Sequence, residues 1–368
     1  MILSTTLPIF SISLTPISIS HFFWLTIARI ETIIFLVGVV IIVLYTKWIT
    51  GHCHLLMRGK NLQPFTLINR NKYHSPKLIQ FGLTDMPQYP GGNWHWKHNK
   101  WIFYASRGNR PYMEDRMHYL NDPRHNLAIF SIFDGHGGPF VSQYLEEHFS
   151  AAIRRRLLRG GSKRQPSLTG HSNDHIIEAI ITEVHNIDDE ILRLHPSLSS
   201  LTGSTLISVI LERNRFLTVV NIGDSRAVAC DVKGHAIPLS IDHKPSDERE
   251  RKRIENAGGF IEFRGVDRLQ GILSVSRAFG DTALKQLSVL TAQPDIVRID
   301  LNEVSLQFIL VASDGFWDVL TSDEAVHLAR SFLRVSSNQW NKVAEYLVRK
   351  ALKLGSDDNI SLLFIRLF

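Results

Sequence analysis

Acidic residues stand at the ends of several apolar runs in this chain. LAIFSIF is followed by Asp134, FLTVVNIG by Asp224, and FILVAS by Asp314, and each of these acids lies beside a glycine. A fourth run, ISLLFIRLF, begins two residues after Asp358. Runs of this length, rich in β-branched and aromatic residues, predict strands. The sequence therefore places carboxylates at the ends of buried strands.

Carboxylates gathered at one place need cations, because like charges a few ångströms apart repel and raise one another's pKa. If the strands pair antiparallel, Asp358 at a strand start can meet Asp134 and Asp314 at strand ends. Carboxylate and carbonyl oxygens without cysteine or paired histidine indicate Mg²⁺ or Mn²⁺ rather than zinc. A single aspartate at a strand end is more often a turn or cap residue. Four of them, together with Glu114 and Asp115, favour a metal site.

Arg110, in RGNRPYMED, lies four residues before Glu114. An arginine alone is more often a surface ion-pair residue, but its planar donors also suit a phosphate group. A metal cluster with an arginine suggests phosphate-ester hydrolysis, in which metals activate water and clamp phosphoryl oxygens. The sequence has no Gly-x-Ser-x-Gly elbow, Walker A loop or kinase signature, which weakens acyl transfer and nucleotide-driven chemistry.

The positive charge is concentrated in one segment. The chain has 368 residues and a formal charge of +6. Residues 47–100 carry eight Lys/Arg against the single acid Asp85, so the rest is close to neutral. This distribution argues against nucleic acid as a partner. The two cysteines, Cys53 and Cys230, are too few for a disulfide framework and fit a reduced, cytosol-facing domain.

An apolar segment near the N-terminus predicts a membrane anchor. From Ile30 to Trp48 only Glu31 and Lys47 are charged, and about 19 residues of helix cross a hydrocarbon core. A buried core helix and a cleaved signal peptide fit less well. The basic residues that follow predict a cytoplasmic C-terminal side, lying beside anionic lipid headgroups. A second span within residues 2–28 stays open, as does the host membrane, with the endoplasmic reticulum as one candidate.

The predicted organisation has four parts. Residues 1–29 form a short non-cytoplasmic segment, 30–48 a single-pass anchor, 49–97 a basic cytoplasmic linker, and 98–368 one catalytic domain. β-rich runs alternate along the domain with helical patterns. The β-rich runs predict strands at 127–133, 205–211, 216–222, 308–312 and 360–367. Helical patterns predict helices at 140–158, 175–194, 246–257, 322–333 and 338–354. The polar stretch 159–174 predicts a mobile loop.

A resemblance to a known family rests on nine motifs in the right order over residues 101–368. The chain resembles the type-2C, metal-dependent serine/threonine protein phosphatases. The motifs are RPYMED, FDGHGG, TGST, GDSRA, DHKP, AGGFI, SVSRAFGD, ASDGFWDVL and SDDNIS. The resemblance implies an α/β (α+β) four-layer sandwich, in which two packed antiparallel β-sheets are flanked by α-helices. It also implies two Mn²⁺ or Mg²⁺ ions at one end of the sandwich, with a weaker third in some members.

The resemblance implies a role for each acidic residue. Asp134 would bridge the two ions and the Gly135 carbonyl would bind one of them, while Asp314 and Asp358 would complete the ligands of the other. Glu114 would act on the first ion directly or through water, with Asp115 behind it. Asp224 and Asp318, with Asp314, match the positions that hold the third ion.

The resemblance also implies the mechanism. Arg110 would bind the substrate phosphate, and His136 would protonate the leaving seryl or threonyl oxygen after attack by metal-activated water. Asp281 would organise the site through hydrogen bonds, and a turn histidine is the alternative for His136. The substrates would be phosphoserine and phosphothreonine proteins in signalling, and the catalytic domain a monomer.

Two other function classes remain to be distinguished. A non-catalytic anchored scaffold of the same fold would be favoured by loss of Asp134, Asp314 or Asp358, and all three are present. A metal-dependent nuclease is disfavoured by the near-neutral domain.

Overall fold

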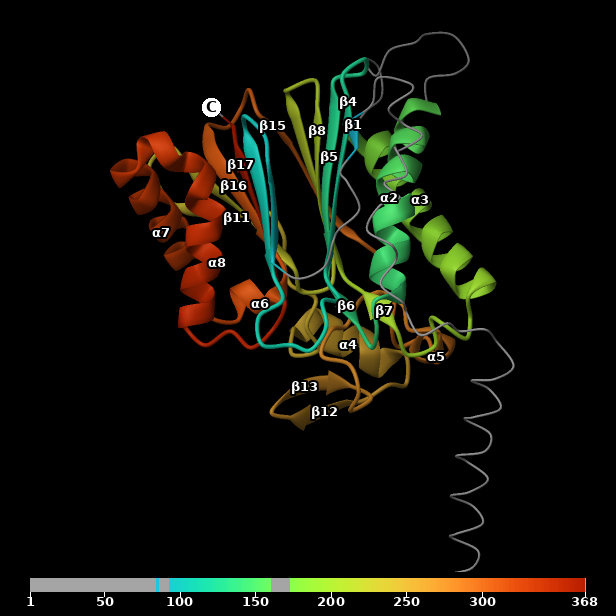
Figure 1. Cartoon of the computed structure of the whole chain (residues 1–368). Helices are drawn as coiled ribbons and strands as arrows, with labels where there is room; N and C mark the ends of the chain where they lie inside the picture. The colour runs from blue at the N-terminus through green and yellow to red at the C-terminus, as the bar shows by residue number, and fades with distance from the viewer. Residues whose placement is uncertain (1–83, 86–92, 160–172, 368) are drawn as a thin grey trace, which may run out of the picture. The chain divides into compact units, whose positions relative to one another are not determined.

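Two six-stranded antiparallel sheets lie face to face at the centre of the folded domain (Figure 1). The computed structural model describes residues 84–85, 93–159 and 173–367, all within one unit spanning residues 74–368. In spatial order, the first sheet contains β1 (Thr84–Asp85), β4 (Arg116–Asp122), β5 (Leu127–Phe133), β8 (Leu206–Glu212), β9 (Phe216–Ile222) and β15 (Asp295–Asp300). The second contains β11 (Ala236–Pro238), β10 (Arg226–Asp231), β16 (Leu306–Ala312), β17 (Ile360–Arg366), β3 (Trp101–Ser106) and β2 (Trp94–Lys97).

Successive residues of the central strands serve two different cores. In β5, Phe130 and Ile132 belong to the core between the two sheets. Ile129 and Phe133 belong to the core between the first sheet and the helices that cover it. Because side chains alternate across a strand, a strand covered on both faces has apolar residues at nearly every position. Burial on both faces explains why the run LAIFSIF is apolar at nearly every position.

Helices cover the outer face of each sheet and complete four layers (Figure 1). The first sheet is covered by α2 (Phe140–Arg159) and α3 (Asn173–Leu194), and the second by α6 (Asp314–Trp317), α7 (Ser322–Val335) and α8 (Val343–Lys353). The buried side chains Ile176, Ile180, Val184, Ile187 and Ile191 of α3 recur every three or four residues. This spacing places one apolar stripe of the helix against the sheet.

Several further elements lie at one end of the sandwich (Figure 1). They are α4 (Glu248–Asn256), α5 (Thr282–Gln286), the hairpin of β12 (Ile261–Arg264) with β13 (Val266–Leu269), and a small sheet. In that sheet β7 (Gly203–Ser204) pairs antiparallel with β6 (Gly135–His136) on one side and β14 (Phe279–Gly280) on the other.

The sequence placed the named strands within two residues of their observed ends, but the predicted helix at 338–354 is wrong in its first part. Residues Ser337–Lys342 form a 3-10 helix, η3, and the α-helix begins only at Val343. Gln339 has a non-helical φ of −117°. Asparagine at 338 and 341 favours local side-chain bonds over helix continuation, which explains the break.

The folded part also begins earlier than predicted. β2 lies inside the predicted linker 49–97 and pairs with β3, and β1 pairs with β4. In the described residues, no helix is both long enough and apolar enough to span a membrane. The predicted anchor at 30–48 and most of the predicted loop at 159–174 lie outside those residues.

Candidate active site

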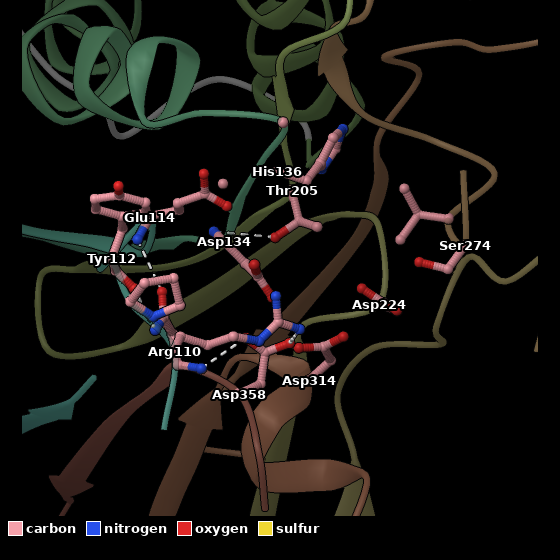
Figure 2. A pocket seen from close by; sticks show the side chains of 15 residues that line it. Arg110, Tyr112, Glu114, Asp134, His136, Thr205, Asp224, Ser274, Asp314 and Asp358 are labelled. Carbon is pink, nitrogen blue, oxygen red and sulfur yellow. Dashed lines mark hydrogen bonds and ion pairs between the residues drawn. The ribbon is translucent and has the colours of Figure 1, made fainter. Parts of the chain in front are cut away.

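A cavity of about 320 Å³ opens where the ends of the two sheets meet (Figure 2). Residues predicted from the sequence to act in catalysis or metal binding line it: Arg110, Glu114, Asp134, Gly135, His136, Asp224, Asp314 and Asp358. Thr205, Ser274 and Asn359 are also part of its wall.

Three buried or half-buried carboxylates form the centre of this site. One oxygen each of Asp134, Asp224 and Asp314 lies within 4.8 Å of the others. Asp134 follows β5, Asp224 follows β9, and Asp314 begins α6 directly after β16. The cluster therefore draws on both sheets.

Asp314 and Asp358 are neighbours for the reason expected from the sequence. β16 and β17 pair antiparallel, with Ala312 opposite Leu362, so the end of one strand lies beside the start of the other. The same argument is wrong for Asp134, because β5 belongs to the first sheet and pairs with β4 and β8. Asp134 reaches the cluster through the face-to-face packing of the two sheets.

The protonation of this cluster is strongly perturbed. Burial, followed by the charge of Asp314, raises the pKa of Asp134 and of Asp224 well above the ordinary value. Burial, with the charges of Asp318 and Asp358, raises the pKa of Asp314 to about 6. The carboxylates therefore disfavour one another's charged forms.

These residues fit a divalent-cation site. The donors are hard carboxylate oxygens crowded at the wall of an open cavity, and cations would neutralise charges that otherwise repel. Lys244 Nζ, at 3.6 Å from Asp224 Oδ2 and 3.4 Å from Asp318 Oδ1, offsets part of this charge. Asp318 thus lies at the edge of the cluster, with 58% of its side chain exposed.

The segment carrying Glu114 and Asp115 is fixed by side chains from the second sheet. Asn359 Oδ1 accepts from the Glu114 backbone N–H at 2.8 Å, and its Nδ2 donates to the Arg107 and Tyr112 carbonyls. Ser313 Oγ donates to Asp115 Oδ2 at 2.9 Å. Burial outweighs the serine hydrogen bonds and raises the pKa of Asp115 to about 7. Asp115 is thereby placed behind the cluster rather than on the cavity wall.

Gly135 allows a close approach that another residue would block. A Cβ at this position would lie 2.6 Å from both the Glu114 carbonyl oxygen and Ser142 Oγ. Ser142 Oγ itself donates to that carbonyl at 2.5 Å. The glycine therefore lets the strand end pack directly on the Glu114 segment.

Arg110 stands at the mouth of the cavity and donates to Asp358 Oδ2 at 2.6 Å (Figure 2). The side chains of Arg110 and Asp358 are 53% and 36% exposed. An exposed ion pair of this kind contributes at most about 1 kcal/mol, so Arg110 can turn towards an anionic ligand at little cost.

Three residues that organise the site lie within the sequence motifs, but the sequence alone predicts no role for them. Thr205 Oγ1 accepts from the Asp134 backbone N–H at 3.3 Å, Asn359 fixes the Glu114 segment, and Lys244 contacts two of the acids. They come from TGST, SDDNIS and DHKP. Their positions in polar motifs beside the acids were the available signal.

Crowded oxygen ligands beside an open cavity with an arginine at its mouth are typical of metal-dependent phosphate-ester hydrolases. Residues 102–360 match the protein phosphatase 2C family. Protein phosphatase 1L of Bos taurus is 37% identical over 276 residues, which are 74% of each protein. Probable protein phosphatase 2C 59 of Oryza sativa subsp. japonica is 38% identical over 267 residues, 72% of this chain and 74% of the rice protein. The chain belongs to the protein phosphatase 2C family and is a metal-dependent serine/threonine protein phosphatase.

Solved structures share the fold. The crystal structure of a phosphatase from a pathogenic strain of Toxoplasma gondii has a TM-score of 0.60 at 25% identity and covers 75% of this chain and 94% of that chain. A C. elegans sex-determining protein has a TM-score of 0.62 at 24% identity, over 74% of this chain and 66% of that chain.

Proposed function

We propose that this protein hydrolyses phosphoserine and phosphothreonine in other proteins, using two Mn²⁺ or Mg²⁺ ions and a membrane anchor that holds the enzyme at its substrates. The observation that carries the catalytic part is the cluster of Asp134, Asp224 and Asp314 on the wall of a cavity that Arg110 borders. Family membership supports the reaction class.

The proposed metal ligands are those that the family motifs imply. Asp134 and the Gly135 carbonyl would hold the first ion with Glu114, and Asp134, Asp314 and Asp358 would hold the second. Bound cations supply charge neutralisation at the phosphoryl oxygens and lower the pKa of the attacking water. Asp224 and Asp318, with Asp314, would hold a weaker third ion, and Asp115 supports Glu114 from behind.

The chain's own side chains orient the substrate and supply the proton. Arg110 donates to phosphoryl oxygens at the cavity mouth, which places the phosphorus atom near the carboxylate cluster. His136, on the cavity wall, gives a proton to the leaving seryl or threonyl oxygen as the P–O bond breaks.

Replacing Arg110 with alanine should raise KM for a phosphothreonine peptide by about 10- to 150-fold, since the charge-assisted bond to phosphate contributes roughly 1.5–3 kcal/mol. The effect on kcat should be smaller. Steady-state phosphate release measures both. Arg107→Ala, an exposed arginine of the same segment, is the matched control and should behave as wild type. An unchanged KM for Arg110→Ala would exclude the proposed phosphate contact.

Substrate class is tested with the purified full chain and three peptides that differ only in carrying phosphoserine, phosphothreonine or phosphotyrosine. We expect Mn²⁺-dependent phosphate release from the first two and much slower release from the third. Equal rates for all three would contradict the assignment to serine and threonine.

The anchor is tested separately. The apolar segment 30–48 and the basic residues that follow it support a single-pass anchor with a cytoplasmic catalytic domain. The full chain expressed in cells should resist carbonate extraction from membranes, whereas a chain beginning at residue 49 should be released. Carbonate-extractable full-length protein would contradict anchoring.

A further inference from the structure

His136 is held by a buried aspartate that lies far away in the sequence. Its Nε2 lies 2.7 Å from Asp281 Oδ2, and 5% of the Asp281 side chain is exposed. A carboxylate only accepts hydrogen bonds, so the proton of this contact belongs to Nε2. His136 Nδ1 has no hydrogen-bond partner in the described part of the chain. One ring nitrogen is thus engaged by Asp281, and the other remains for a ligand in the cavity.

The small three-stranded sheet brings the two residues together. Its central strand β7 pairs His136 with Gly203 on one side and Gly280 with Gly203 on the other. The Asp281 backbone N–H continues this pairing by donating to the Thr202 carbonyl at 2.9 Å. Asp188, from α3, accepts from the Gly280 backbone N–H at 3.0 Å and thereby holds β14 in place.

The residue between them is a glycine for a steric reason. A Cβ on Gly203 would overlap both Asp281 Oδ2 and His136 Nε2. The contact between the imidazole and the carboxylate therefore passes directly over the bare backbone of β7. A side chain at this position would separate the two groups.

Asp281 adopts a backbone conformation that most residues avoid. Its φ of 48° and ψ of 49° lie in the left-handed region, where a non-glycine residue is destabilised by about 1 kcal/mol or more. Glycine would be relaxed here but could not reach His136. Strain retained at a position where the side chain contacts a site residue suggests a function for that side chain.

We propose that Asp281 is a positioning residue for His136: it fixes the ring and keeps one proton on Nε2, so that Nδ1 faces the leaving oxygen. This inference rests on the proposed role of His136 as the proton donor. It follows the general logic by which a carboxylate orients an acid–base histidine.

The protons balance as follows. As the P–O bond breaks, its electron pair stays on the seryl or threonyl oxygen, which takes the proton from Nδ1 of the doubly protonated ring. Nε2 keeps its proton towards Asp281. The water that gives its oxygen to phosphorus releases a proton, and solvent reprotonates Nδ1 for the next turnover.

Asp281→Asn is the sharpest variant, because asparagine also tolerates the left-handed conformation but carries no charge. Two substrates separate positioning from a structural role. A phosphothreonine peptide needs a proton donor for its alkoxide, whereas p-nitrophenyl phosphate has a leaving group that is stable as an anion. We expect kcat for the peptide to fall about 10- to 100-fold, part of the roughly 10²- to 10⁴-fold that a positioned proton donor contributes, and kcat for p-nitrophenyl phosphate to fall less than about threefold.

Matched variants complete the test in the full-length protein with Mn²⁺. Asp189→Asn, an exposed aspartate on α3, should leave both substrates unaffected. His136→Gln should show the same preference for the activated substrate, and the His136→Gln/Asp281→Asn double variant should lose little more than His136→Gln alone. Gly203→Ala should reproduce the selective loss.

Each other outcome contradicts a different claim. Equal losses on both substrates, or no loss on either, would overturn the positioning role of Asp281. If the wild type hydrolysed neither substrate, the proposed function itself would fail. Additive losses in the double variant would show that Asp281 acts independently of His136.

Discussion

Replacing Asp134 with alanine should lower phosphate release from a phosphothreonine peptide by more than about 100-fold. Changing only a partner of a metal ligand commonly costs 10- to 100-fold, and Asp134 is the proposed bridge between both ions. Asp134 is also one of the three carboxylates of the central cluster. The loss should appear in kcat at saturating peptide and persist at high Mn²⁺ concentration.

An aspartate elsewhere in the same sheet system provides the control. Asp300 lies at the far end of β15 from the site, where it accepts from Arg215. Asp300→Ala should keep nearly full activity because this ion pair is partly exposed. Comparable losses in the two variants would mean that Asp134 acts through the fold rather than in catalysis.

Replacing Glu250 with alanine should destabilise the protein by about 3–5 kcal/mol, the range for breaking a buried ion pair. Glu250 Oε1 accepts from Arg277 Nη2 at 2.5 Å and Nε at 3.0 Å, and Oε2 accepts from Ser276 Oγ at 2.9 Å. Only 1% of the Glu250 side chain and 8% of the Arg277 side chain are exposed. Removing the acid leaves much of the Arg277 charge buried without its main partner.

Urea unfolding at pH 7 measures this loss. Glu248→Ala on the same helix is the control, because its pair with Lys252 is exposed and contributes at most about 1 kcal/mol. Similar losses for the two glutamates would show that the buried pair adds nothing beyond a surface pair.

The pKa of Glu250 predicts that its contribution to the stability of the fold depends on pH. Burial alone would raise its pKa, but the hydrogen bonds and charge of Arg277, with Ser276 and Arg253, lower it from the ordinary 4.5 to about 2. A pKa that is lower in the folded state stabilises the fold above the unfolded pKa. The stability difference between wild type and Glu250→Gln should therefore shrink as pH falls from 4.5 towards 2. A difference that stayed constant over this range would contradict the pKa.

Strands buried on both faces were readable from the sequence because their apolar runs are nearly unbroken. LAIFSIF and FLTVVNI correspond to β5 and β9 residue for residue. Short edge strands such as β2 alternate between half-buried and exposed residues, and their polarity resembles a linker. The sequence carries little signal for such elements, because their pairing partner rather than their own composition determines them.

The candidate site was predicted in its residue types but not in the way it is assembled. The motifs identified the acids. Asp134 and Asp358, however, come from different sheets, and their proximity depends on how the sheet that contains β5 packs against the sheet that contains β17. The contact of His136 with Asp281 spans 145 residues and depends on the two-residue strand β7. The pattern of residues within a short stretch of sequence does not predict a contact that depends on the pairing of three short strands.

The central claim is that the carboxylate cluster binds divalent cations and that this binding enables hydrolysis. The most direct test follows the melting temperature and phosphate release of the full chain while Mn²⁺ is added after treatment with EDTA, for wild type and Asp134→Asn. Binding at 100 times Kd stabilises a protein by about 2.7 kcal/mol. We predict that wild-type melting temperature and activity rise together over one Mn²⁺ range, and that Asp134→Asn shows neither rise. Full activity of the wild type in EDTA, or an equal Mn²⁺ response in the variant, would contradict the claim.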